Sequence, residues 1–297
     1  MHKFNLVIQL SLLLCLIFLS CSLTDDIDSC DDLTISIYAS NLRNHQSAAI
    51  YEDNVFLVTN RRTRIYKYDL VQCQMVDSIV MPVGKGTTPS GDVLYHCNQS
   101  SFSPCFYSTS DKYPLLFISQ RAKEDKRCFA EVYRLLFNDN KYSAQLIQTI
   151  LFPVMTEENS MGNVNVVFDA ENKVMYTYSR NNDTMSTNYG VCKISKFTIP
   201  SFDIPIVYLN DEDIISSFSI ECEAINMQGA CIHNGVLYIG QGIKSPILRT
   251  INLDTGLLTT YNIKKKGCKY EPEGCFWYNE SLMISTRKCI YKIDLSK

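Results

Sequence analysis

Five polar residues head copies of one recurring sequence pattern, and their side chains are the first candidates for chemistry. They are four amides and one carboxylate: Gln46, Asn98, Asn163, Gln228 and Glu273. Such groups, gathered into a ring, could hold the hydroxyls of a sugar or a hydrated cation. The same side chains could instead cap strand ends and satisfy backbone groups. The pattern therefore predicts either a binding ring or the polar lining of a channel.

Glu271 and Glu273 are two residues apart, so on an extended strand their side chains lie on the same side. A pair of carboxylates can perform general acid and base catalysis, as in glycosidases. Neighbours on one strand do not flank a substrate, however. Without a catalytic role, Glu271 is expected to pair with Lys269 or Arg287 in a solvated loop. This pair alone predicts a poor glycosidase.

A hydrolase would need a partner for Glu273 on an opposite wall, and His96 or Glu223 could supply it. The same three residues could form a metal site of one imidazole and two carboxylates. A lone histidine more commonly makes one satisfied hydrogen bond, so no metal is predicted. Arg287 is an auxiliary candidate, since a guanidinium near the same mouth could hold an anion.

Established catalytic patterns are missing from the sequence. It has no GxSxG elbow, P-loop, Rossmann fingerprint or HExxH pattern, and no CxxC pair or Cys/His zinc spacing. The net charge of -3 argues against a nucleic-acid partner, which a basic face would mark. We therefore expect no cofactor and favour a monomeric binding protein over an enzyme.

The recurring pattern itself indicates the fold. Residues 228–239 and 273–284 match position for position: a polar residue and Gly, an apolar strand, an Asn-containing turn and a second strand. The Asn234–Gly235 turn is a strong hairpin signal. The five copies begin 52, 65, 65 and 45 residues apart, near or above the roughly 40 to 50 residues of a propeller blade. The sequence predicts an all-β, five-bladed propeller.

Closure of the ring is predicted from the two ends of the pattern. The last copy provides three strands, while residues 33–38 read as a strand without a blade. We expect this N-terminal strand to complete the C-terminal blade, with Ile35 beside residues 290–295, which would cover two exposed sheet edges. Six blades remain the alternative if the run of residues 204–220 forms a separate sheet.

The N-terminus has the features of an export signal. Residues 1–20 combine a basic start with an apolar run, and residues 18–21 (FLSC) resemble a bacterial lipobox that would leave Cys21 diacylated. An acidic tether of residues 21–32 would follow, with residues 33–297 as one propeller domain. The expected location is the bacterial outer membrane or cell surface. An ordinary secretory signal, giving a secreted or periplasmic protein, is the alternative.

The thirteen cysteines fit an exported protein in which disulfides can form. Without Cys15 in the signal and Cys21 as the anchor, an odd number remains, so at least one thiol is unpaired within the chain. The local pairs Cys97/Cys105 and Cys268/Cys275 flank loops. We predict that one or both of these pairs form bridges.

Short strings spread over the mature chain resemble uncharacterised Bacteroides-type lipoproteins with a propeller fold. The strings are YHCN at 95–98, PLLFIS at 114–119, CF at 128–129, QLIQTI at 145–150 and EPEG at 271–274. The resemblance implies the envelope of a gut commensal, and it supplies no catalytic residues. Taken with the ring of polar residues, it predicts a lipid-anchored protein that binds a glycan or an envelope protein. The alternative is a propeller hydrolase acting on a carbohydrate or a lactone.

Overall fold

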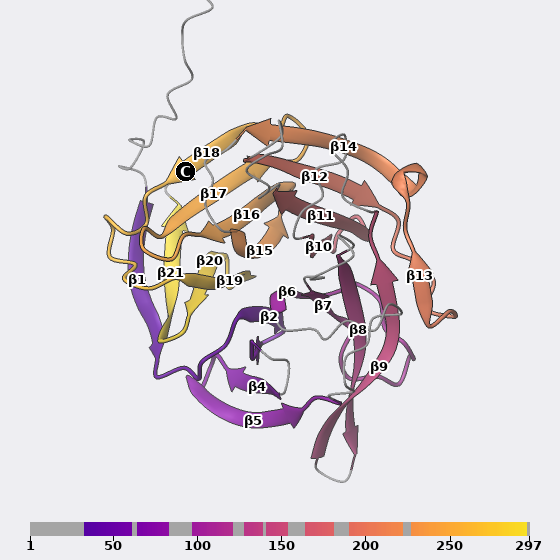
Figure 1. The fold of residues 1–297 in the computed structure, drawn as a ribbon. Coiled ribbons are helices and arrows are strands. Elements are labelled where there is room, and N and C mark those ends of the chain that lie inside the picture. The colour runs from indigo at the N-terminus through magenta and orange to yellow at the C-terminus, as the bar shows by residue number, and fades with distance from the viewer. Residues whose placement is uncertain are drawn as a thin grey trace, which may run out of the picture.

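The structure, a computed structural model, describes residues 33–60, 64–82, 97–120, 128–138, 141–153, 164–180, 190–221 and 227–295. The export signal, Cys21 and the acidic tether therefore lie outside the described residues. Five sheets, antiparallel except at the outer edge of one of them, stand around a common axis, and Figure 1 views the ring along that axis. The protein is a five-bladed β-propeller, as predicted. In the described part of the chain, no helix is long and apolar enough to cross a membrane.

Each blade runs outward from an innermost strand, and its strands are given in that order. Blade 1 contains β2 (Ser47–Tyr51), β3 (Asn54–Val58), β4 (Arg64–Asp69) and β5 (Gln74–Val80). Blade 2 contains β6 (Cys97–Phe102), β7 (Leu116–Gln120), β8 (Phe129–Asn138), β9 (Lys141–Leu151) and β13 (Ile206–Tyr208). Blade 3 contains β10 (Asn165–Asp169), β11 (Val174–Arg180), β12 (Val191–Phe197) and β14 (Ile214–Glu221). Blade 4 contains β15 (Met227–His233), β16 (Val236–Gln241), β17 (Ile247–Asn252) and β18 (Leu258–Tyr261). Blade 5 contains β19 (Pro272–Tyr278), β20 (Ser281–Thr286), β21 (Cys289–Leu295) and β1 (Leu33–Ser40).

The first hairpins of blades 4 and 5 share one turn geometry, which explains why their sequences align without a gap. Asn234 and Gly235 both adopt positive φ, at 49° and 72°, as a two-residue type I′ turn requires. Asn279 and Glu280 adopt the same conformation at 46° and 60°. Glu280 therefore adopts a left-handed backbone conformation that glycine adopts more easily. For this reason Asn279–Glu280 is a weaker turn signal than Asn234–Gly235.

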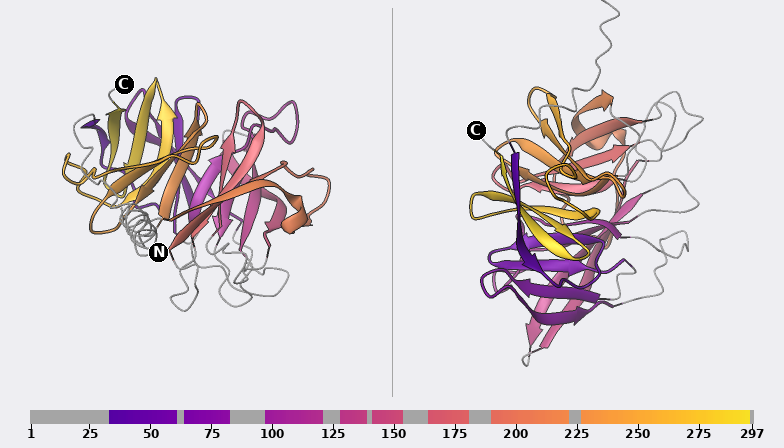
Figure 2. Two further views of the ribbon diagram at one scale, coloured as in Figure 1. Left: turned by 90° about the horizontal axis from the view of Figure 1, so that it is seen from above. Right: turned by 90° about the vertical axis from the view of Figure 1, so that its left-hand side faces the viewer.

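Ring closure follows the predicted register. β1 pairs antiparallel with β21, and Ile35 lies opposite Ile293. In the right-hand view of Figure 2, indigo β1 lies beside yellow β21. Leu33 is buried in the core between blades 4 and 5, and the Tyr38 hydroxyl donates to the Leu70 carbonyl of blade 1. The first and last strands of the propeller domain therefore belong to one sheet.

The run of residues 204–220 does not form the separate sheet that a sixth blade would require, and it is divided between two blades. Its first part, β13, pairs in parallel with β9 at the edge of blade 2, and its second part, β14, completes blade 3. A short 3-10 helix, η1 (Asp211–Asp213), separates the two. The Gln148 amide of blade 2 holds the crossing segment by donating to the carbonyls of Ser201 (2.7 Å) and Ile204 (2.8 Å).

Five larger hydrophobic clusters fill the five interfaces between neighbouring blades. The alternation of side chains along each strand divides them between the two sides of a blade. In blade 4, Leu237, Ile239 and Ile251 pack toward blade 3, while Tyr238 and Leu248 pack toward blade 5. A side chain's position along a strand therefore decides which interface it enters.

The axis is closed by close contacts among the innermost strands. A Cβ atom on Gly229 would lie 2.2 Å from the Gly274 Cα, so the strands of blades 4 and 5 approach as only glycine allows. From blade 2, the Gln99 side chain reaches the Ala230 backbone of blade 4. Its Nε2 donates to the Ala230 carbonyl (2.8 Å), and its Oε1 accepts from the Ala230 N–H (3.1 Å). This paired contact fills the axis at that level.

Neither predicted disulfide is present in the structure, in which Cys105, Cys268 and Cys275 carry free thiols. Cys97 begins β6 and Cys105 lies three residues beyond its end, and the six residues of β6 already span about 17 Å. A disulfide requires Cα atoms within about 7 Å, so the structure keeps these two cysteines too far apart for a bridge. Cys268 and Cys275 share the core between blades 4 and 5, where burial raises the pKa of each thiol to about 12.

Candidate functional site

Three of the five leading residues lie together where the innermost strands begin, an end of the axis that we call the N-terminal mouth. Gln46 directly precedes β2, Gln228 lies near the start of β15, and Glu273 lies near the start of β19. All three side chains are buried, and Glu273 is 0% exposed. The structure therefore joins polar groups of blades 1, 4 and 5 at this mouth.

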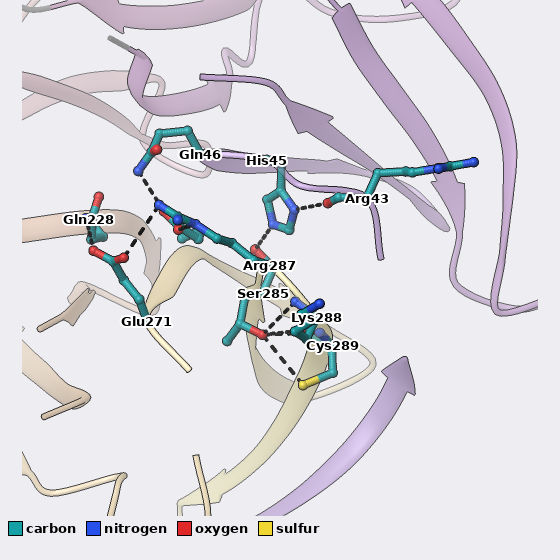
Figure 3. A network of polar contacts seen from close by, with 11 residues as sticks. Arg43, His45, Gln46, Gln228, Glu271, Ser285, Arg287, Lys288 and Cys289 are labelled. Atoms are coloured by element: carbon teal, nitrogen blue, oxygen red, sulfur yellow. Dashed lines mark hydrogen bonds and ion pairs between the residues drawn. The ribbon is translucent and has the colours of Figure 1, made fainter. Parts of the chain in front are cut away.

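Glu273 is the centre of a continuous polar network, of which Figure 3 labels several members. Its Oε2 accepts from Gln46 Nε2 at 2.7 Å, and its Oε1 accepts from Arg287 Nε at 2.6 Å. Arg287 Nη2 also lies 3.7 Å from Glu271 Oε2, and Glu271 Oε1 accepts from Gln228 Nε2 at 2.7 Å. We call these five residues the Glu273 network. The predicted pairing of Glu271 with Arg287 is one of its contacts.

The electrostatics of the Glu273 network are dominated by burial of Glu273. Burial, followed by repulsion from the Glu271 carboxylate, raises the pKa of Glu273 to about 8, although Arg287 acts in the opposite direction. The Arg287 guanidinium is half exposed, and its hydrogen bond to Glu273 raises its own pKa. The network thus combines a carboxyl group that titrates near neutral pH with a cation that solvent can reach.

We expect this raised pKa to make stability depend on pH. An acid with a folded-state pKa near 8, above its ordinary 4.5, stabilises the fold fully below pH 4.5 and loses that contribution as pH rises through 8. Urea unfolding measures the free energy of unfolding of the wild type and of Glu273→Gln at each pH. As pH rises from 4.5 to 8, the value for the wild type should fall relative to that for Glu273→Gln by up to about 1.4 kcal/mol per pH unit. The exposed Asp294→Asn serves as the control, and parallel profiles for Glu273→Gln and the wild type would contradict the assignment.

A buried histidine beside the Glu273 network was not singled out by the sequence. His45 precedes Gln46, and its Nδ1 lies 2.8 Å from the Arg43 carbonyl, so Nδ1 donates. Its Nε2 is then free to accept from the Ser285 hydroxyl at 3.1 Å. Burial lowers the pKa of His45 to about 4. The imidazole is therefore neutral near pH 7 and holds the start of blade 1 against blade 5.

The remaining predicted site residues are placed as follows. Asn163, His96 and Glu223 lie outside the described residues. Asn98 lies in β6 but does not join the Glu273 network. Asn98 occupies the bulge position in β6 that Glu273 occupies in β19, and the next residue, Gln99, which is equivalent to Gly274, reaches the axis. Blade 2 thus has a glutamine where blades 4 and 5 have Gly229 and Gly274, and its side chain extends to the axis.

Sequence reasoning also missed buried polar residues at the ends of the second strands. Gln120 ends β7 and Gln241 ends β16, and both side chains are 0% exposed. Arg249, in the middle of β17, is 2% exposed. A glutamine directly after an apolar strand in two copies of the repeat was the available signal. For Arg249 the sequence gives no such signal, because a charged residue on an outer strand is usually solvated.

The opposite end of the axis, the C-terminal mouth, has a different character. A cavity of about 230 Å³ is lined by the innermost strands of all five blades, with small and apolar residues such as Ala48, Val167 and Ala230. Trp277 also lines it, and the His233 ring stacks on Trp277 with a centroid separation of 4.0 Å. The polar network and this cavity lie on opposite sides of the Gln99 contact.

The chemistry open to the N-terminal mouth follows from its geometry. Glu273 lies in β19 and Glu271 directly precedes that strand, so both stand on one wall, and both already accept hydrogen bonds. Within the described ranges, no group of three or more His, Cys, Asp and Glu side chains is arranged to hold a metal ion. The described residues offer recognition groups, namely amides, a guanidinium and carboxylates, without a second catalytic group opposite Glu273.

Comparison with known proteins gives similarity to solved structures alone. No protein-family model and no curated protein matches the sequence. Glutaminyl cyclase from Myxococcus xanthus is similar with a TM-score of 0.48 and 9% identity, over 89% of this chain and 97% of that chain. The computationally designed protein Ika8 is similar with a TM-score of 0.37 and 10% identity, over 86% of this chain and 98% of that chain.

Proposed function

We propose that this protein is a non-enzymatic binding protein of a bacterial envelope that takes a glycan at the N-terminal mouth. The observation that carries the proposal is the Glu273 network, in which amide, carboxylate and guanidinium groups of three blades meet above a closed axis. Such planar polar groups hydrogen-bond sugar hydroxyls. Arg287 is half exposed and is the member that a ligand would reach first.

Binding is favoured over hydrolysis by the placement of the two carboxylates. Glycosidases place two carboxyl groups on either side of the scissile bond, about 5 to 9.5 Å apart. Glu271 and Glu273 stand on one wall instead. A carbohydrate or lactone hydrolase is the second candidate, because the raised pKa of Glu273 suits a general acid. It would need His96 or Glu223 as the opposite group, and both lie outside the described residues.

Arg287→Ala is expected to weaken glycan binding at least about tenfold, since it removes a charge-assisted hydrogen-bond donor from the mouth. The matched control is Lys288→Ala, which removes the neighbouring exposed cation but no member of the Glu273 network. Calorimetric titration with a panel of neutral and acidic oligosaccharides provides the measurement. Equal affinities of both variants and the wild type would reject the site. Release of shortened oligosaccharides that stops in Glu273→Gln would favour the hydrolase.

We further propose that diacylated Cys21 holds the protein on the envelope, through the lipobox-like residues 18–21 and the acidic tether that follows. In cells of a lipoprotein-processing bacterium, the wild type is expected to incorporate labelled palmitate and to sediment with membranes. Cys21→Ser should lose the label and become soluble. Cleavage at another residue, with Cys21→Ser unchanged in location, would instead indicate an ordinary secreted protein.

A further inference from the structure

Among the described residues, nine buried side-chain polar atoms have no hydrogen-bond partner, and five of them belong to three side chains. They are Nε and Nη1 of Arg249, Nε2 and Oε1 of Gln241, and Oδ1 of Asn165. Arg249 and Asn165 are 2% exposed and Gln241 is 0% exposed. Buried polar groups are normally satisfied, and a buried charge is normally paired. These three side chains therefore call for a binding partner.

Strand alternation directs all three side chains into the interface between blades 3 and 4. Arg249 lies directly opposite Ile239, and Gln241 is two residues beyond Ile239 on the same face. Ile239 belongs to the hydrophobic cluster that fills this interface. Diagonal neighbours on adjacent strands are about 7 to 8 Å apart at Cα, within reach of long side chains. Arg249 and Gln241 can therefore contact a single small molecule.

Asn165 enters the same interface from blade 3. It alternates with Val167, which belongs to that hydrophobic cluster. Asn165 lies at the start of β10, Gln241 ends β16, and Arg249 is the third residue of β17. Because the innermost strands begin at the N-terminal mouth and β16 ends there, all three residues lie toward that end of the propeller. The site is separate from the Glu273 network, which joins blades 4, 5 and 1.

The unpartnered atoms specify the chemistry of an occupant. Three are nitrogen donors, two on a guanidinium and one on an amide, and they match the oxygens of a carboxylate. The other two, Gln241 Oε1 and Asn165 Oδ1, are acceptors that a carboxylate cannot satisfy. We propose that Arg249, Gln241 and Asn165 bind a small organic acid whose carboxylate lies beside an O–H or N–H donor. An α-hydroxy acid or an α-amino acid has this combination.

Thermal unfolding of the full propeller with small acids tests the site. Glycolate and glycine provide the two donor types, acetate provides a carboxylate alone, and glycerol provides hydroxyls alone. At about 100 times Kd, the matching acid should raise the melting temperature by roughly 5 °C. Acetate should give a smaller rise and glycerol none. The larger of the glycolate and glycine responses identifies the donor.

Variants separate this site from general effects of acids. Arg249→Met should abolish the response and, in ligand-free buffer, leave the melting temperature unchanged or higher, because an unpaired buried charge is removed. Gln241→Leu should also lose the response, which keeps the test open if Arg249→Met fails to fold. The control is Thr177→Val, whose hydroxyl is also buried without a partner but alternates with Met175 toward blade 2. It should keep the full response.

Three results would overturn the proposal. The first is no rise in the wild-type melting temperature with any of the acids. The second is an equal rise in Arg249→Met and the wild type. The third result combines two observations: ligand-free Arg249→Met melts several degrees below the wild type, and Gln241→Leu keeps the full rise in melting temperature with the acids. Together they would show that the guanidinium of Arg249 has its partner within the chain. None of these results bears on glycan binding at the Glu273 network.

Discussion

A chain that begins at residue 41 is expected to lose the folded state, whereas a chain that begins at residue 33 keeps it. The difference is β1, which pairs with β21 over the length of the strand and buries Leu33 and Ala39. Without it, the edge of β21 is exposed and the apolar contacts around Ile290 and Ile293 are lost. We expect a loss of more than about 5 kcal/mol, a large part of the stability of an ordinary domain.

Urea unfolding and size-exclusion chromatography of the two chains measure this effect, with aggregation of the shorter chain as the expected result. A permuted chain provides the matched control. It begins at residue 41 and carries residues 33–40 after residue 295 through a short flexible linker, so that the strand is restored at a different point in the sequence. A shorter chain as stable and monomeric as the longer one would show that β1 does not close the ring.

Gly229→Ala is expected to destabilise the fold by about 3 kcal/mol or more, at the upper end of the cost of overpacking. The new Cβ would lie 2.2 Å from Gly274 Cα, 2.7 Å from the Glu273 carbonyl and 2.9 Å from the Gly274 nitrogen. All three are backbone atoms, so relief requires that the innermost strands of blades 4 and 5 move apart. Equilibrium unfolding in urea gives the loss directly.

Gly235→Asn is the matched control for Gly229→Ala, because it changes a glycine of the same blade in open space. Its φ of 72° suits asparagine, and a Cβ there meets nothing within 4 Å. We expect a cost below about 1 kcal/mol. Since Glu273 precedes Gly274, Gly229→Ala should also disturb the pH dependence assigned to Glu273. Equal stabilities of the two variants would contradict the close contact at the axis.

The features that sequence predicted are those encoded locally. Turn residues and alternating apolar residues fix each hairpin by themselves, so the aligned copies beginning at Gln228 and Glu273 correctly indicated two similar blades. The unpaired strand around Ile35 and the missing fourth strand at the other end correctly indicated closure. The joining of Gln46, Gln228 and Glu273 followed because equivalent positions of a repeat meet around an axis.

The features that sequence did not predict depend on neighbours distant in the chain. Gln99 stands where blades 4 and 5 have glycine, and its contact at the axis is with the backbone of Ala230 in blade 4. Cys97 and Cys105 look adjacent in sequence, but an extended strand separates them. The path of β13 to blade 2 depends on the Gln148 amide, which satisfies carbonyls of a segment more than 50 residues away. Arg249 is buried only because blade 3 covers its side of blade 4.

The path of β13 has a mechanical consequence for the ring. The chain leaves β12 of blade 3, pairs in parallel with β9 of blade 2, and then returns to blade 3 as β14. This segment therefore joins blades 2 and 3, and the two blades can separate only after the pairing of β13 with β9 breaks. Under mechanical load or during partial unfolding, blades 2 and 3 should separate from the other blades as a pair. The first interface to open should therefore be one other than the interface between blades 2 and 3.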